Sequence, residues 1–187
     1  MIFLKPIAAK YFELVEEKIT LHDFDNWILT NDGLETELGE SLYIEVISLN
    51  YSDANTTYEL SKLLKNHFDN GEFETLRLLE LLEVIITRKG KEAEALIRIY
   101  DLYCTCYDFL KLGVDIGLHI AVPYEYGVQW FHELTERQQV KIVDKHYPLA
   151  KTEAKKMKKL LLDKTIVLTG KKGGEYDYLQ YLDKRKK

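Results

Sequence analysis

The chain has 187 residues, of which 46% are hydrophobic and 30% charged, a balance that excludes general disorder. No apolar run approaches the roughly 20 residues of a membrane-spanning helix, so we expect no membrane partner. Residues 1–70 carry 13 Asp or Glu against 5 Lys or Arg, residues 71–150 carry 13 against 9, and residues 151–187 carry 5 against 12.

The length fits a single domain over residues 1–187, with helices over 1–163 and a β-hairpin appendage over 164–184. The first residues have one lysine after a short apolar run and no small-residue cleavage site, so we expect no signal peptide. Cys104 and Cys106 point about 200° apart on a helix, which favours reduced thiols and a cytoplasmic protein.

The N-terminal half has helical periodicity. Residues 7–19 place apolar side chains along one stripe. Asp32 and Glu35 resemble a capping box that opens a helix, and Thr56 with Glu59 repeats this signal before the next helix. The helix after Asp32 is expected to face inward through Leu34, Leu38, Leu42, Val46 and Leu49.

The helical pattern continues in the second half. Apolar residues cover more than one face of 74–86, which predicts a central helix enclosed by others. Residues 92–112 form the clearest amphipathic helix, after which glycines break the pattern. Thr135 and Gln138 cap another helix, and Pro148 is expected to stop it and start a lysine-rich helix that ends near Asp163.

The last segment changes to a period of two. Thr165–Thr169 and Tyr176–Tyr181 flank a Lys-Lys-Gly-Gly turn, which predicts a β-hairpin. A lone hairpin is marginally stable in water, so its tyrosines are expected to pack on the helices. The predicted fold is mainly α: an irregular antiparallel helical bundle, or stacked helix pairs, with a C-terminal β-hairpin.

The strongest candidate for a functional site is a run of carboxylates without any Lys or Arg among them. Its members are Asp23, Asp25, Asp32, Glu35, Glu37, Glu40 and Glu45. Some of them would serve as helix caps, because carboxylates near helix starts interact favourably with the helix dipole. Capping does not require all seven, however, and an acidic patch speeds the approach of a cationic partner. Trp27 and Tyr43 lie within this run and are candidate partner-binding anchors, although burial explains Trp27 equally well.

Catalytic and metal-binding motifs are absent from the sequence. The five histidines lack the i, i+4 spacing of a helical zinc site, and no phosphate loop, dinucleotide fingerprint or nucleophile elbow is present. We therefore predict no enzymatic activity, no catalytic residue, no metal and no cofactor. The alternative is an enzyme that uses dispersed residues such as His119, His132 and Asp115.

The basic C-terminal segment raises the question of nucleic acid binding. Lysine outnumbers arginine 11 to 1 over residues 151–187, and a chain that is acidic overall would repel a polyanion. We therefore expect a solvated helix face and no direct contact with nucleic acid. The segment could equally pair with the acidic half, within the fold or between subunits.

Three stretches together carry a resemblance: Leu38–Tyr43 running on to Ile47–Tyr51, then Tyr100–Cys104, then Ile166–Gly170. They resemble small bacterial cytosolic immunity proteins encoded beside polymorphic or contact-dependent growth inhibition toxins. The resemblance implies a protein that binds a cognate toxin domain in the cytoplasm and blocks its active site or an essential surface. Many such toxins are basic nucleases, which would suit the acidic half. No family residue transfers individually, because these interfaces differ between toxin–immunity pairs.

The leading hypothesis is therefore a non-enzymatic immunity protein that neutralises a toxin, most simply a ribonuclease, through the acidic residues. The alternative is a helical scaffold or regulatory protein-binding module without a toxin partner.

Overall fold

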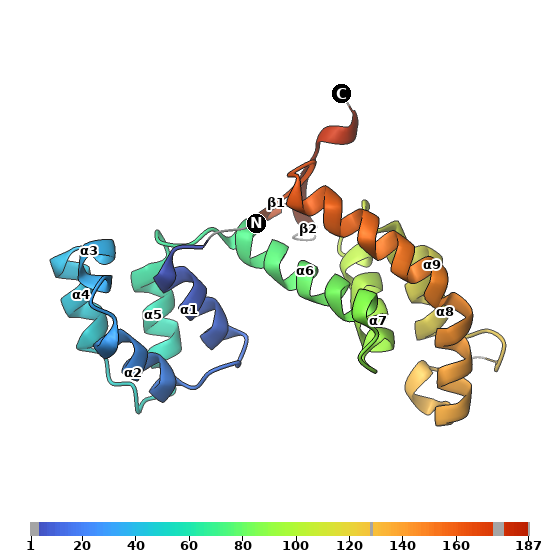
Figure 1. The fold of residues 1–187 in the computed structure, drawn as a ribbon, viewed down its shortest axis with the longest axis horizontal. Helices are drawn as coiled ribbons and strands as arrows, with labels where there is room; N and C mark the ends of the chain where they lie inside the picture. The colour runs from blue at the N-terminus through green and yellow to red at the C-terminus, as the bar shows by residue number, and fades with distance from the viewer. Residues whose placement is uncertain (1–3, 128, 174–177, 187) are drawn as a thin grey trace. The chain divides into compact units, whose positions relative to one another are not determined.

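The computed structural model describes residues 4–127, 129–173 and 178–186 (Figure 1). The chain is mainly helical over these residues and ends in an antiparallel two-stranded hairpin, which confirms the predicted fold class. Within the same residues, no helix has the length and apolar character needed to cross a membrane.

Contacts between residues gather in two compact units. We call residues 2–69 the N-terminal unit and residues 70–187 the C-terminal unit. The N-terminal unit holds 13 acidic and 5 basic residues, a net charge of −8, whereas the C-terminal unit holds 18 acidic and 21 basic residues, a net charge of +3. The N-terminal unit is therefore the more acidic of the two, and the excess of basic residues in the C-terminal unit comes from residues 151–187. The single domain expected over residues 1–187 stays a prediction.

The N-terminal unit is a set of short helices (Figure 1), each of which buries apolar side chains. These helices are α1 (Pro6–Val15), α2 (Leu21–Thr30), α3 (Leu34–Leu38), α4 (Glu40–Ile47) and α5 (Thr56–Leu64). Ile7, Phe24, Leu34, Val46 and Leu60 come one from each helix and are fully buried. Burying such side chains contributes about 1.5–3 kcal/mol each, so this shared core holds the short helices together.

Two details of the expected helix starts are wrong. The helix predicted after Asp32 is divided into α3 and α4 at Gly39, whose φ of 80° lies in the left-handed region. No side chain caps the start of α3, so the capping box of Asp32 and Glu35 does not form. The Thr56 hydroxyl likewise donates to the backbone oxygen of Asn50 (2.6 Å) instead of capping α5.

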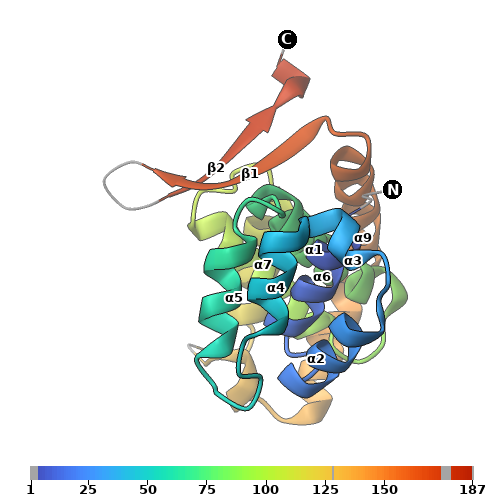
Figure 2. The ribbon, with the colours of Figure 1, turned by 90° about the vertical axis from the view of Figure 1, so that its left-hand side faces the viewer.

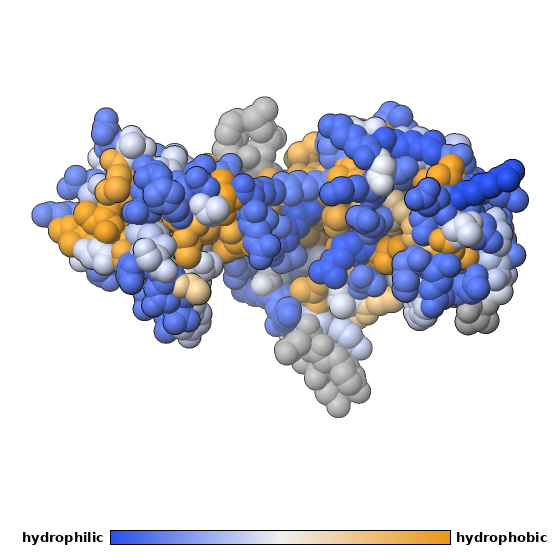
Figure 3. All heavy atoms as spheres, turned by 90° about the horizontal axis from the view of Figure 1, so that it is seen from below, coloured by the Kyte–Doolittle hydropathy of each residue, from blue (hydrophilic) through white to orange (hydrophobic). Residues whose placement is uncertain are grey.

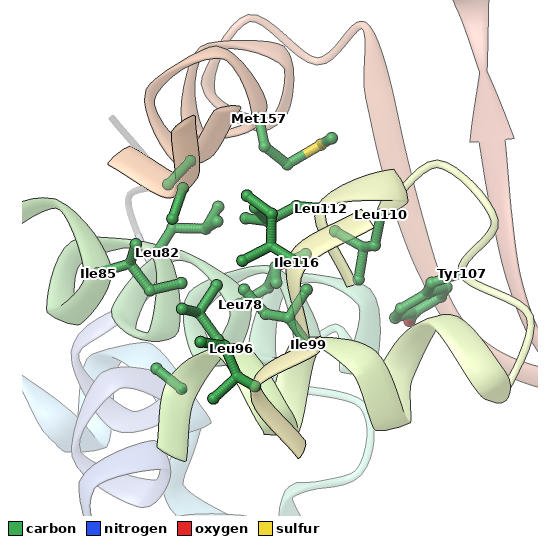
Figure 4. Packing of buried hydrophobic residues seen from close by; sticks show 14 of the residues in the cluster. Leu78, Leu82, Ile85, Leu96, Ile99, Tyr107, Leu110, Leu112, Ile116 and Met157 are labelled. Carbon is green, nitrogen blue, oxygen red and sulfur yellow. The ribbon is translucent and has the colours of Figure 1, made fainter. Parts of the chain in front are cut away.

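The C-terminal unit is arranged around α6. Its elements are α6 (Asn70–Thr87), α7 (Glu92–Cys104), the π-helix η1 (Gly113–Gly117), α8 (Leu118–Ala121), the 3₁₀ helix η2 (Phe131–Glu133), α9 (Glu136–Leu162), β1 (Ile166–Gly173), β2 (Tyr178–Asp183) and the 3₁₀ helix η3 (Lys184–Lys186). Helix α6 packs against α7, α9 and β1, which confirms the prediction of an enclosed central helix. Figure 4 shows Leu78, Leu82 and Ile85 of α6 in the core with Leu96 of α7 and Met157 of α9.

Helix α9 does not stop at Pro148, contrary to the expectation from the sequence. Proline in a helix interior removes one backbone hydrogen bond and normally breaks the helix. Here buried side chains continue on both sides of it, from Ile142 and Val143 to Ala150, Met157 and Leu161. The packing of this continuous apolar stripe offsets the cost of the proline.

The hairpin contacts α6 through β1, but Tyr181 of β2 packs on two rings in the turn that follows α7 and not on a helix as had been predicted. The Tyr181 ring lies 4.7 Å from that of Phe109 and 6.0 Å from that of Tyr107, measured between ring centroids. The strands pair in antiparallel register from Ile166 opposite Asp183, with an irregularity after Leu168 (Figure 2). The predicted turn and the start of the second strand fall on residues 174–177, outside the described residues.

Candidate functional site

The structure places all nine predicted partner-binding residues in the N-terminal unit. Asp23, Asp25 and Trp27 lie on α2, Asp32 precedes α3, Glu35 and Glu37 lie on α3, and Glu40, Tyr43 and Glu45 lie on α4. Five of these side chains are exposed, namely Asp23, Asp32, Glu35, Glu40 and Glu45. The other four are half-buried. The exposed members form a carboxylate surface, which we call the acidic surface.

Across residues 4–69, the carboxylates of the acidic run form no ion pairs with lysine, although the charges of His22 and Lys10 act on Asp23 from a distance. Lys10 instead pairs with Glu13 (2.8 Å between Nζ and Oε2), and Lys62 lies over the Tyr58 ring (4.2 Å from Nζ to the ring centroid). The seven carboxylates therefore have no ion-pair partner within this part of the chain.

Asp23 is also a helix cap. Its carboxylate accepts hydrogen bonds from the Thr20 backbone N–H (2.9 Å) and hydroxyl (2.7 Å), and the Thr20 hydroxyl accepts from the Asp23 N–H (3.1 Å). These hydrogen bonds from Thr20 hold the pKa of Asp23 below its usual value of 3.8. A capping box therefore forms at the start of α2, between Thr20 and Asp23, and not at Asp32 as predicted. Asp23 thus has a structural role besides its charge.

Asp25 lies beside a tyrosine near the end of α4. Burial, and then the charge of Asp25, raise the pKa of Tyr51. The Tyr51 hydroxyl donates to the backbone oxygen of Val46 (2.8 Å), so its role is to anchor the turn that follows α4. Trp27 is half-buried with its ring 6.0 Å from Phe24, and Tyr43 is half-buried as well. Their role as partner-binding anchors stays a prediction.

Helix α4 instead offers an apolar side chain that the sequence analysis missed. Its exposed residues recur at helical spacing and are Glu40, Ser41, Ile44, Glu45 and Ser48. Ile44 is 51% exposed between the two glutamates. The exposure of Ile44 could have been predicted from the sequence, because Ile44 does not belong to the inward stripe of Leu34, Leu38, Leu42, Val46 and Leu49.

A shallow groove between α4 and α5 lies next to this face. It encloses about 520 Å³ and is lined by Glu45, Ser48, Leu49, Glu59, Lys62 and Leu63. Tyr58, 62% exposed, borders it through its contact with Lys62. The lining thus combines two leucines with two carboxylates and one lysine. Figure 3 shows hydrophobic surface among hydrophilic surface on the N-terminal unit.

The residues of the alternative enzyme hypothesis lie in η1, α8 and η2. Among the described residues, no hydrogen bond, ion pair or ring contact joins His119 to His132 or Asp115. His119 is instead next to His146, with which the sequence analysis had not associated it. Burial, together with Lys145 and His119, lowers the pKa of His146.

No protein-family model, curated protein or solved structure matches this chain.

Proposed function

We propose that this protein is an immunity protein that binds and neutralises a cognate toxin domain, most simply a basic ribonuclease, through the acidic surface of its N-terminal unit. The observation that carries the proposal is the separation of charge. One compact unit has a net charge of −8 and no arginine, and its carboxylate run is without ion-pair partners among the described residues. The weak sequence resemblance supports the choice of a toxin as the partner.

The physical role of the acidic surface is attraction and orientation. A nuclease carries a cationic cleft for its substrate, and an opposing carboxylate surface occupies that cleft in place of phosphates. Such complementarity raises association rates from about 10⁵–10⁶ to as much as 10⁸–10⁹ M⁻¹s⁻¹ at low salt. Ile44 and the α4–α5 groove then supply the apolar contact that slows dissociation.

The first experiment is co-expression with the C-terminal domain of the protein encoded immediately upstream, with purification through a tag on this chain. We expect a stoichiometric complex and cell death when this chain is omitted. Healthy cells and no complex would contradict the proposal.

A triple charge reversal then tests the surface. Glu35→Lys, Glu40→Lys and Glu45→Lys together change the charge of the N-terminal unit from −8 to −2, and we expect loss of protection. The matched control reverses Glu94, Asp115 and Glu136, which are exposed on the C-terminal unit. Glu94 and Glu136 lie in first helical turns, as Glu35 and Glu40 do, so the control reproduces the unfavourable effect on helix dipoles. A triple variant that is folded by circular dichroism and still protects cells would rule out the surface.

A scaffold without a toxin partner remains the second candidate, because exposed apolar side chains also occur on the C-terminal unit. They include Trp130, Val140 and Leu149. A scaffold would bind host proteins and would protect against no upstream toxin. The co-expression experiment therefore separates the two functions.

A further inference from the structure

The groove between α4 and α5 is built from two chain segments with the same pattern of side chains. Helices α4 and α5 pack against each other within the N-terminal unit (Figure 2). Each segment lines the groove with residues at i, i+3 and i+4, the spacing that places side chains on one helical face, namely Glu45, Ser48, Leu49 and Glu59, Lys62, Leu63. Each side of the groove therefore carries a glutamate and, four residues later, a leucine.

The charged groups of this groove are not paired with one another. Glu45 and Glu59 are exposed, and among the described residues neither forms an ion pair. Lys62 instead lies over the ring of Tyr58, with its Nζ atom 4.2 Å from the ring centroid. This cation–π contact shows that the ring at the border of the groove accepts a cation, while both carboxylates of the lining have no cationic partner in this part of the chain.

We propose that this groove binds an arginine side chain of a partner protein. A guanidinium group is planar and has five N–H donors, so it can donate to two carboxylates that belong to different helices. The aliphatic stem of an arginine packs on apolar surface, which Leu49 and Leu63 provide here. The ring of Tyr58 offers a face on which the guanidinium can stack once Lys62 moves aside.

The lining decides the class of ligand. Two carboxylates against one lysine, on a unit with a net charge of −8, attract cations and repel anions. A lysine ammonium is a compact and strongly hydrated point charge without the planar fork of arginine, so it should bind less well. The inference deepens the proposed function and rests on it only for the identity of the partner. A nuclease would supply such a side chain, because arginine is favoured for the recognition of nucleic acid.

Titration with a minimal ligand tests the groove without any toxin. Isotopically labelled full-length protein is titrated with Nα-acetylarginine methylamide and followed by NMR. We expect saturable changes of chemical shift at α4 and α5. The citrulline analogue has the same shape without the charge and should bind about tenfold more weakly, and the lysine analogue should also bind more weakly than arginine.

Substitutions of similar size identify the groups that bind. Glu45→Gln and Glu59→Gln should each weaken the binding of the arginine analogue about tenfold. Glu35→Gln is the matched control, because Glu35 is an exposed glutamate of α3 outside the groove and its replacement removes the same charge. Lys62→Gln should strengthen binding, because it frees the ring of Tyr58 and removes a positive charge. Circular dichroism checks that each variant is folded.

Three results would overturn the proposal: no saturable binding, equal binding of the citrulline analogue, or equal effects of Glu35→Gln and Glu45→Gln. The last of these would mean that net charge alone attracts the ligand. Because the ligand contains no toxin, a failed co-expression contradicts the proposed function and not this site. A failed titration beside successful protection of cells removes only the arginine site.

Discussion

At the scale of single residues, glycine and capping side chains decide local geometry. Gly170 directly precedes the Lys-Lys-Gly-Gly segment that was predicted to form the hairpin turn. The structure places it within β1, with a φ of 63° and its α-carbon directly against Asn70 at the start of α6. A side chain there would overlap the Cβ and backbone atoms of Asn70, so both the conformation and the close approach require glycine.

We therefore predict that Gly170→Ala lowers the free energy of unfolding by about 2–4 kcal/mol, from the left-handed backbone and the steric overlap together. Urea denaturation measures the change. Gly33→Ala is the control, because its backbone φ is −86° and an added Cβ would meet only an ordinary contact at 3.6 Å. Equal effects of the two substitutions would contradict the packing of β1 on α6.

The hydrogen bonds that cap α2 predict how its stability changes with pH. The pKa of Asp23 is lowered in the folded state, so its stabilising effect is present above the unfolded value of 3.8 and is lost as the pH falls through the folded value. Thr20→Val removes the hydroxyl that contributes most to this shift, and the pKa of Asp23 should rise. NMR titration of the carboxyl group measures it. Asp163, whose pKa is lowered by Thr165, should titrate unchanged in the same variant.

At the scale of elements, packing decides where helices end. Helix α9 continues through Pro148 because its buried face continues, whereas the helix expected to run past Asp32 is divided at Gly39. The helix predicted over 92–112 ends at Cys104, and Cys106 follows with a φ of 79°. That turn directs Tyr107 and Phe109 toward the hairpin, where Tyr181 packs on both rings.

Pro148 is exposed and lies inside α9, so its replacement tests whether the helix is continuous there. Pro148→Ala restores a backbone N–H and should raise the free energy of unfolding by about 1–3 kcal/mol. A shift of the melting temperature by a few degrees would report it. Pro6→Ala is the control, because Pro6 is at the first position of α1, where a backbone N–H would have no hydrogen-bond acceptor within the helix. This substitution should not stabilise the protein. A loss of stability in Pro148→Ala would show that the helix is interrupted.

At the scale of the whole molecule, the two compact units differ in net charge. The N-terminal unit is strongly acidic and the C-terminal unit slightly basic. Attraction between exposed charges is screened beyond about 10 Å at 0.1 M salt. A complex that forms through the acidic surface should therefore depend on salt mainly through its association rate.

We predict that the association rate with the cognate toxin falls at least tenfold as salt rises from about 0.05 to 0.5 M, while the dissociation rate changes little. Stopped-flow fluorescence measures both rates. Ile44→Ser should instead raise the dissociation rate and leave the salt dependence of association unchanged. This substitution removes apolar contact without altering charge. Association that is insensitive to salt would mean that the partner binds elsewhere.

The sequence by itself determined the helical class, the C-terminal hairpin, the inward stripe through Leu34, Leu38 and Val46, and the accumulation of carboxylates before residue 70. These features depend on residue type and on spacing between near neighbours, which a linear sequence records directly. Tertiary structure alone decided that Trp27 is half-buried, that a groove lies between α4 and α5 next to Ile44, and that His119 lies next to His146. These outcomes depend on contacts between residues far apart in the chain, and packing energy there outweighs local preference.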